Sequence, residues 1–199
     1  MQCMITVVID PTEMPATSVV EINPAAILST HDHPDHTDSA YVSKYEGVPK
    51  LYHEEGEIKT KDFEIYTIAS SHKFDKIDGS NLIIVIEVDG LRIAHMGDIG
   101  QTALTDEQML QLGQIDIAFM QFDNSYSAMS LENEKGFGLI AQVNPKIINP
   151  THYTEDCNGV FTEKYGEVKE FDNILEITKD ELPETNMNMY KILNSHTYK

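Results

Sequence analysis

Short apolar runs bounded by polar turns recur along the chain and predict β-strands. Residues 63–68 alternate apolar with polar side chains, which is the pattern of a half-buried strand. Residues 81–88 are almost continuously apolar, as in a strand that is covered on both faces. Asp89-Gly90 follows directly, and this dipeptide is typical of the type I′ turn of a β-hairpin. Further strands are predicted at residues 5–9, 25–29, 91–94, 117–120 and 146–148.

Three other segments carry helical patterns. Residues 105–108, Thr-Asp-Glu-Gln, form a capping box that starts a helix, and Gly113 ends it. Residues 131–143 predict a second helix, which stops before a proline. Residues 163–174 predict a third, with apolar side chains at helical spacing. Periodicity alone therefore predicts an α/β protein with a mixed sheet.

The run His-Asp-His-Pro-Asp-His at residues 31–36 carries the chemistry most clearly. Side chains two residues apart point to the same side of an extended backbone, so His31 and His33 can bind one ion. Pro34 turns the chain, so Asp35 and His36 can face a second ion. Imidazole and carboxylate are ligands that suit Zn²⁺, Fe²⁺ or Mn²⁺. For any single histidine, a solvated polar loop is the alternative.

Three later residues each follow a predicted strand and are candidate ligands: His72, Asp98 and His152. In α/β sheets, ligand sites gather at the carboxyl ends of the strands, so residues distant in sequence can meet there. Taken singly, either histidine could be a surface or core residue, and Asp98 could be a turn residue. Their order after the first motif is what makes them candidates.

This arrangement resembles the metallo-β-lactamase superfamily. The resemblance implies an αββα sandwich of two mixed β-sheets with helices on the outer faces. It also implies two divalent metal ions, with Zn²⁺ the first expectation and Mn²⁺ or Fe²⁺ the alternatives. One ion would be held by His31, His33 and His72, and the other by Asp35, His36 and His152, with Asp98 bridging both.

Three features resemble the branch that contains L-ascorbate-6-phosphate lactonase and related metal-dependent hydrolases. They are Ser-Ser-His at residues 70–72, His-Met-Gly-Asp at residues 95–98 and Pro-Thr-His-Tyr at residues 150–153. The likeness extends over roughly residues 5–155. The chain departs from that branch at residues 122–127, where a Gly-Gly-x-Tyr-Thr-like loop is expected.

The resemblance implies hydrolysis of a small-molecule ester, lactone or phosphorylated substrate by a metal-bound hydroxide. Asp35 would orient that hydroxide besides binding metal. His95 would either donate a proton to the substrate or orient Asp98. Asn124 and Tyr126 are expected to line the substrate pocket. Two alternatives stay open: a phosphodiesterase or nuclease of the same superfamily, and a non-catalytic metal-binding protein.

The charge balance is strongly acidic, with 14 Lys and Arg against 33 Asp and Glu and a formal net charge of −19. Such a surface repels phosphate backbones, so a nucleic-acid partner is disfavoured. A chain of 199 residues that is 41% hydrophobic predicts a single domain over residues 1–199. With two cysteines, no apolar run near the ~20 residues of a membrane span and no signal-peptide pattern, we expect a cytoplasmic protein without a membrane partner.

Residues 5–9 are apolar and uncharged, and the strand that usually precedes Asp10-Pro11 in the resembled branch is expected to be missing. They would then lie near a sheet edge with an unpaired neighbour. An exposed apolar edge is a template for strand addition. We therefore expect either a homo-oligomer formed through this edge or a covering segment, with residues 187–193 as the candidate.

Overall fold

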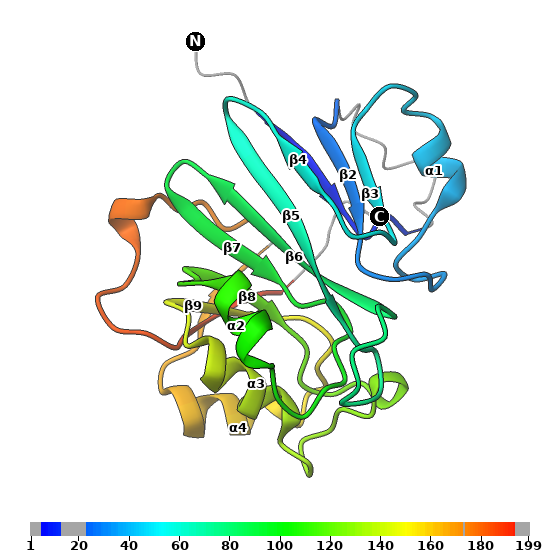
Figure 1. Cartoon of the computed structure of the whole chain (residues 1–199). Coiled ribbons are helices and arrows are strands. Elements are labelled where there is room, and N and C mark those ends of the chain that lie inside the picture. The colour runs from blue at the N-terminus through cyan, green and yellow to red at the C-terminus, as the bar shows by residue number, and fades with distance from the viewer. Residues whose placement is uncertain (1–4, 13–22, 173, 194–199) are drawn as a thin grey trace.

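The computed structural model describes residues 5–12, 23–172 and 174–193, and two β-sheets face each other in it (Figure 1). The smaller sheet has the order β1-β2-β3, and its pairs are parallel. The larger sheet has the order β10-β11-β9-β8-β7-β6-β5-β4; it is antiparallel from β4 to β7 and parallel from β7 to β10. The strands are β1 Val7–Ile9, β2 Ala26–Ser29, β3 Lys50–Tyr52, β4 Glu57–Lys59, β5 Phe63–Ser70, β6 Asn81–Val88, β7 Leu91–His95, β8 Ile117–Met120, β9 Ile147–Pro150, β10 Lys169–Phe171 and β11 Asn188–Ile192.

Alternation along β5 and β6 builds the two layers of core. Ile65 and Ile84 are fully buried between the sheets, against Leu28 of β2. Their sequence neighbours, such as Ile83, point the other way and pack under the helices. A strand that is buried on both faces has no polar face, which explains the continuous apolar run in β6.

Helices cover both outer faces. Helix α1 (Ser39–Ser43) packs on the smaller sheet, where Tyr41 and Val42 contact Ile27. Helices α2 (Asp106–Leu112), α3 (Lys135–Val143) and α4 (Cys157–Tyr165) lie on the outer side of the larger sheet (Figure 1). Two short 3₁₀ turns, η1 (Ser125–Ser127) and η2 (Lys179–Glu181), complete the elements of the described residues. The predicted αββα sandwich is confirmed, with the mixed pairing confined to the larger sheet.

Local signals placed several boundaries correctly. Asp89 and Gly90 both have positive φ, 50° and 78°, as a type I′ turn requires, and they join β6 to β7. The capping box at Thr105 is present, and α2 ends at Gly113. The helix predicted over residues 131–143 begins only at Lys135, because Ser130 and the residues after it form a hydrogen-bonded turn.

Two predictions about the C-terminal quarter are wrong. The helix predicted over residues 163–174 ends at Tyr165, since Gly166 takes a φ of 78°, and the chain then forms β10. Ile174, one of the apolar side chains at helical spacing in that segment, is 65% exposed. Residues 187–193 do not cover β1 either; they contain β11, which lies between β9 and β10 in the larger sheet. Strand β1 is the edge of the smaller sheet within the described residues.

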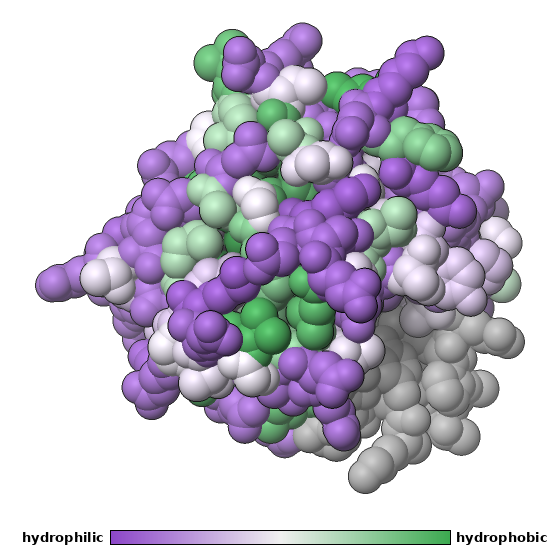
Figure 2. Space-filling model, turned by 90° about the horizontal axis from the view of Figure 1, so that it is seen from below, coloured by the Kyte–Doolittle hydropathy of each residue, from purple (hydrophilic) through white to green (hydrophobic). Residues whose placement is uncertain are grey.

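The outer surface is mostly hydrophilic, as the acidic composition leads one to expect. Figure 2, the view from below, shows a mostly hydrophilic face with several hydrophobic areas, one of them near the middle of the view. Among the described residues, no helix is long and apolar enough to span a bilayer.

Candidate metal centre

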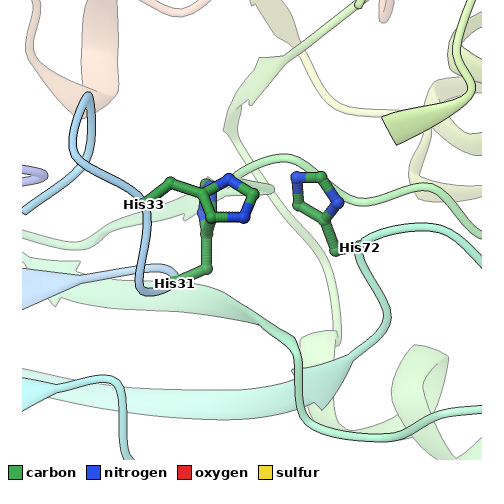
Figure 3. Close-up of side chains that lie close together, drawn as sticks. All are labelled: His31, His33 and His72. Carbon is green, nitrogen blue, oxygen red and sulfur yellow. The ribbon is translucent and has the colours of Figure 1, made fainter. Parts of the chain in front are cut away.

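Three histidines from two loops lie close together. His31 and His33 are in the loop that follows β2, and His72 is in the loop that follows β5. Nε2 of His31 lies 3.1 Å from Nδ1 of His33. His72 joins them, and one ligand atom from each of the three residues lies within 4.8 Å of the others. Figure 3 shows the three imidazoles gathered, with His72 approaching from a different segment of the chain. His31 and His72 are buried, whereas His33 is exposed.

A second cluster lies beside the first. Asp35, His36 and His152 also offer one ligand atom each within 4.8 Å of one another. The rings of His36 and His152 are stacked with centroids 5.4 Å apart. Only His36 of this group is buried, so this side of the centre is more open to solvent. The two clusters contain the same residues that the resemblance assigned to the two metals.

Asp98 lies between the clusters, and its two oxygens face different sets of histidines. Oδ2 is 3.9 Å from Nε2 of His31 and 3.6 Å from Nε2 of His72. Oδ1 is 3.7 Å from Nε2 of His36 and 3.6 Å from Nδ1 of His152. The structure therefore brings all seven predicted ligands together, with Asp98 at the centre.

The turn before Asp98 explains why a glycine precedes it. Gly97 has a φ of 59°, and a Cβ there would lie 2.4 Å from Oδ1 of Asn81 and 2.8 Å from the side chain of Thr30. That Asn81 oxygen accepts a hydrogen bond of 2.9 Å from the amide of Asp98, and its Nδ2 donates to the carbonyl of Met96. Asn81 thus fixes the backbone that presents the carboxylate.

Asp10 and Thr30 orient two of the histidines, and the sequence interpretation assigned neither a role. Nδ1 of His36 lies 2.9 Å from Oδ2 of Asp10, which leaves Nε2 free to face the cluster. The Thr30 hydroxyl donates to the same carboxylate at 2.8 Å and lies 2.9 Å from Nδ1 of His31. His31 therefore presents its Nε2 as well. The sequence signals were the polar Asp10 and Thr30 directly after two apolar strands.

Burial and charge tune the protonation of these groups. Burial, reinforced by the His36 imidazole, lowers the pKa of His31 to about 4 against the opposing effect of Asp98. A neutral imidazole is the form that binds metal. Burial alone would raise the pKa of Asp98, but the nearby imidazoles of His72, His152 and His36 outweigh it and hold that pKa below its usual range. His31 is therefore neutral, and Asp98 ionised, at neutral pH.

Two atoms of the centre have no hydrogen-bond partner although they are buried. They are Nε2 of His72 and Oδ1 of Asp98. A buried polar atom without a partner is costly, and in a native protein it calls for an explanation. Since both atoms face the other candidate ligands, the residues present suit a metal ion.

The residues predicted to contact substrate occupy different positions. Tyr126 is 75% exposed and lines two pockets. One, of about 570 Å³, is also lined by His31, His33 and His72, and the other, of about 690 Å³, is also lined by Asp35 and His152. Asn124 is buried, and its Nδ2 donates to Oδ2 of Asp98 at 2.6 Å and to Oε1 of Gln121 at 2.9 Å. Asn124 is thus in direct contact with the central carboxylate, a partnership that the sequence did not indicate.

His95 does not line either pocket. Its Nδ1 accepts a hydrogen bond of 3.1 Å from the amide of Gly97, and its ring stacks on Phe119 with centroids 5.6 Å apart. Burial lowers the pKa of His95, with Asp10 opposing this. His95 thus contacts β8 through Phe119 and the turn that carries Asp98 through Gly97.

His53 is a pocket residue that the sequence interpretation missed. It follows β3 with a φ of 59°, an uncommon conformation for a residue with a side chain. Its ring stacks on Tyr52, and its Nδ1 lies 3.8 Å from Oδ1 of Asp32. Both His53 and Asp32 line the 570 Å³ pocket. The only sequence signal was a histidine directly after a short apolar strand.

Comparison with known proteins agrees with this geometry. The family model described as "Beta-lactamase superfamily domain" matches residues 4–152. A candidate Zn-dependent hydrolase of the metallo-β-lactamase superfamily from Thermotoga maritima is similar in structure, with a TM-score of 0.66 and 20% identity over 94% of this chain and 88% of that one. A candidate metal-dependent hydrolase from Parabacteroides distasonis has a TM-score of 0.60 and 19% identity over 79% and 78%.

A metallo hydrolase from Ignicoccus hospitalis is also similar, with a TM-score of 0.53 and 18% identity over 75% of this chain and 76% of that one. No curated protein matches the sequence. At these levels of identity the structural likenesses concern the fold, and the residues of the centre carry the chemical argument.

Proposed function

The chain belongs to the metallo-β-lactamase superfamily, and from this premise we propose that it is a metal-dependent hydrolase with two metal ions. The observation that carries the proposal is the position of Asp98. Its Oδ2 faces His31 and His72, while its Oδ1 faces His36 and His152. A carboxylate placed in this way can bridge two ions.

In this proposal His31, His33 and His72 hold one ion, and Asp35, His36 and His152 hold the other. Imidazole and carboxylate donors suit Zn²⁺, which we propose as the native metal, and they also suit Mn²⁺ and Fe²⁺. The unpartnered Nε2 of His72 and Oδ1 of Asp98 support two positions, because one atom belongs to each side of the centre.

When bound, the two ions would supply Lewis acidity and lower the pKa of a water molecule toward neutrality. The protein's own residues position the rest. Asp10 and Thr30 hold His36 and His31 so that each presents Nε2. The Asp35 carboxylate, 70% exposed and 3.7 Å from Nε2 of His36, can accept a proton from the attacking water on the open side of the centre.

We assign His95 a positioning role. The amide of Gly97 donates to Nδ1 of His95, and Gly97 directly precedes Asp98. A proton donor must reach the substrate, yet His95 lines neither pocket beside the histidines. The geometry therefore favours an action on Asp98 through the turn, and not a proton transfer to the leaving group.

The pockets and the charge support a small-molecule substrate. Volumes of about 570 and 690 Å³ suit compounds of metabolite size. The net charge of −19 disfavours a polyanion as the substrate. We propose an ester, a lactone or a phosphorylated compound, in a cytoplasmic setting supported by the small number of cysteines.

Metal analysis followed by a substrate panel tests this function. Protein purified without chelator should contain close to two transition-metal ions per chain and should hydrolyse at least one member of a panel of esters, lactones, thioesters and phosphodiesters. Asp98→Asn keeps the shape of the side chain but removes its charge, and it should lower both metal content and turnover. Asp106→Asn makes the same change on an exposed residue of α2 and serves as the control. Absence of bound metal after reconstitution with Zn²⁺ and Mn²⁺ would refute the proposal.

A further inference from the structure

Two exposed aromatic side chains stand beside the candidate metal centre. Phe74, in the loop between β5 and β6, is 66% exposed, and Tyr126, in η1, is 75% exposed. Both line the 570 Å³ pocket, together with His31, His33 and His72. A single exposed apolar residue needs no explanation, but two aromatic rings that share a pocket with three candidate ligands do.

The backbone of each aromatic residue is held by a neighbour of a candidate ligand. The amide of Phe74 donates to Oγ of Ser71, the residue before His72, at 3.2 Å. The amide of Tyr126 donates at 3.0 Å to Oδ1 of Asn124, whose Nδ2 in turn contacts Asp98. The two rings are therefore attached to the centre by short hydrogen-bonded paths.

A glycine brings the two aromatic loops together. A Cβ on Gly100 would lie 2.2 Å from the carbonyl oxygen of His72 and 2.5 Å from that of Ser127. Only a residue without a side chain allows both loops to approach at this point. Phe74 and Tyr126 lie within two residues of these carbonyls in the sequence. The close approach of the two loops therefore places both aromatic rings around one pocket.

Besides the histidines, three charged side chains line this pocket, namely Asp32, Lys73 and Asp78. The carboxylate of Asp78 is engaged by the backbone amide and the hydroxyl of Ser80. Asp32 faces His53 at 3.8 Å. Lys73 is exposed, so its ammonium can stay in water while a ligand occupies the pocket. Apart from the histidines, Phe74 and Tyr126 supply the ring faces of the lining.

We propose that this pocket binds a planar, apolar group of the substrate, such as an aryl ring, between Phe74 and Tyr126. The inference rests on the proposed hydrolase function and narrows its substrate class to esters or lactones that carry such a ring. Flat rings pack well against aromatic faces, and each such contact typically contributes a few-fold to about tenfold in affinity. The reacting carbonyl would then lie on the side of His31, His33 and His72.

The experiment compares ring-bearing with ring-free ligands on the metal-loaded protein. Binding of benzoate and of acetate is measured by calorimetry, and kcat/KM is measured for methyl phenylacetate and methyl acetate, which share the same leaving group. Benzoate should bind more tightly than acetate. Phe74→Ala and Tyr126→Ala should each reduce that preference by about 3- to 10-fold, and the double variant should reduce it further. The ratio of kcat/KM for the ring-bearing ester to that for the ring-free ester should fall in parallel.

Leu110→Ala is the matched control, because Leu110 is 84% exposed on α2 and lines neither pocket. It should leave the preference unchanged. Hydrolysis with no preference for rings, or a preference that survives in the double variant, would overturn this inference while the proposed function stands. Ring-selective binding that depends on Phe74 and Tyr126, without hydrolysis of any ester, would support the pocket and count against the hydrolase.

Discussion

The contact between Asn124 and Asp98 allows a quantitative prediction about metal binding. Nδ2 of Asn124 donates one hydrogen bond to Oδ2 of Asp98, at 2.6 Å, and a second to Oε1 of Gln121, at 2.9 Å. Oδ1 of Asn124 accepts from the amide of Tyr126 at 3.0 Å. The amide is therefore fully engaged, and it fixes the rotation of the Asp98 carboxylate so that each oxygen faces its own set of histidines.

Asn124→Ala removes that constraint and has two opposing effects. A carboxylate without its donor keeps more charge on Oδ2, which would strengthen metal binding. It also becomes free to rotate, so that one oxygen no longer faces each cluster. We expect the loss of orientation to dominate, because a bridge needs both oxygens in place at once.

The expected size of the effect follows from the bond that is lost. Hydrogen bonds to charged groups contribute about 1.5–3 kcal/mol, and ~1.4 kcal/mol corresponds to a factor of ten in an equilibrium constant. Residues that orient metal ligands typically change metal affinity by about 10- to 100-fold. We therefore expect Asn124→Ala to weaken binding of at least one ion by about 10- to 100-fold.

Calorimetric titration of the chelator-treated protein with Zn²⁺, in competition with a chelator of known affinity, measures this change. Thermal melting of the metal-free variant checks that the fold is retained. Ser125→Ala is the control, since Ser125 lies on the same loop, is exposed, and its side chain makes no hydrogen bond with the described residues. If Asn124→Ala binds two ions as tightly as the unaltered protein, the orienting role of Asn124 is refuted.

Three further predictions follow from the centre and the fold. Asp98→Ala should abolish turnover and lower the amount of bound metal. His95→Ala should keep both ions, lower kcat/KM by about 10- to 100-fold and leave the shape of the pH profile of kcat/KM unchanged. If one side of that pH profile disappears in His95→Ala, His95 is a proton donor, and if an ion is lost, His95 is a metal ligand. The affinity of the protein for single- and double-stranded DNA and RNA at physiological salt should be negligible, because its 33 acidic residues outnumber its 14 basic ones. Micromolar binding that falls steeply with added salt in a fluorescence-anisotropy titration would contradict this. Concentration-dependent self-association is expected through β1, which pairs only with β2 in the described part of the chain, and light scattering that gives the monomer mass at every dilution would rule it out.

Local sequence signals determined much of this protein. The positive φ values at Asp89-Gly90 and the capping box at Thr105 depend on residues within one turn of each other, so they could be predicted without the fold. The seven candidate ligands could also be named, because the motif at residues 31–36 and the order of the three later residues resemble a known family, and ligand sites gather at the carboxyl ends of strands. The motif at residues 31–36 carries four of them in one loop.

The tertiary structure alone decided which groups support those ligands. Asp10 contacts His36 and Asn124 contacts Asp98, each pair separated by 26 positions in the sequence. The C-terminal segment looked suited to cover β1, and residues 163–174 looked helical. Pairing within the larger sheet instead placed β11 beside β9, and β10 beside β11. Contacts of this kind depend on which distant segments are packed together. A local pattern records only which face of a segment is apolar, and not the partner that will cover it.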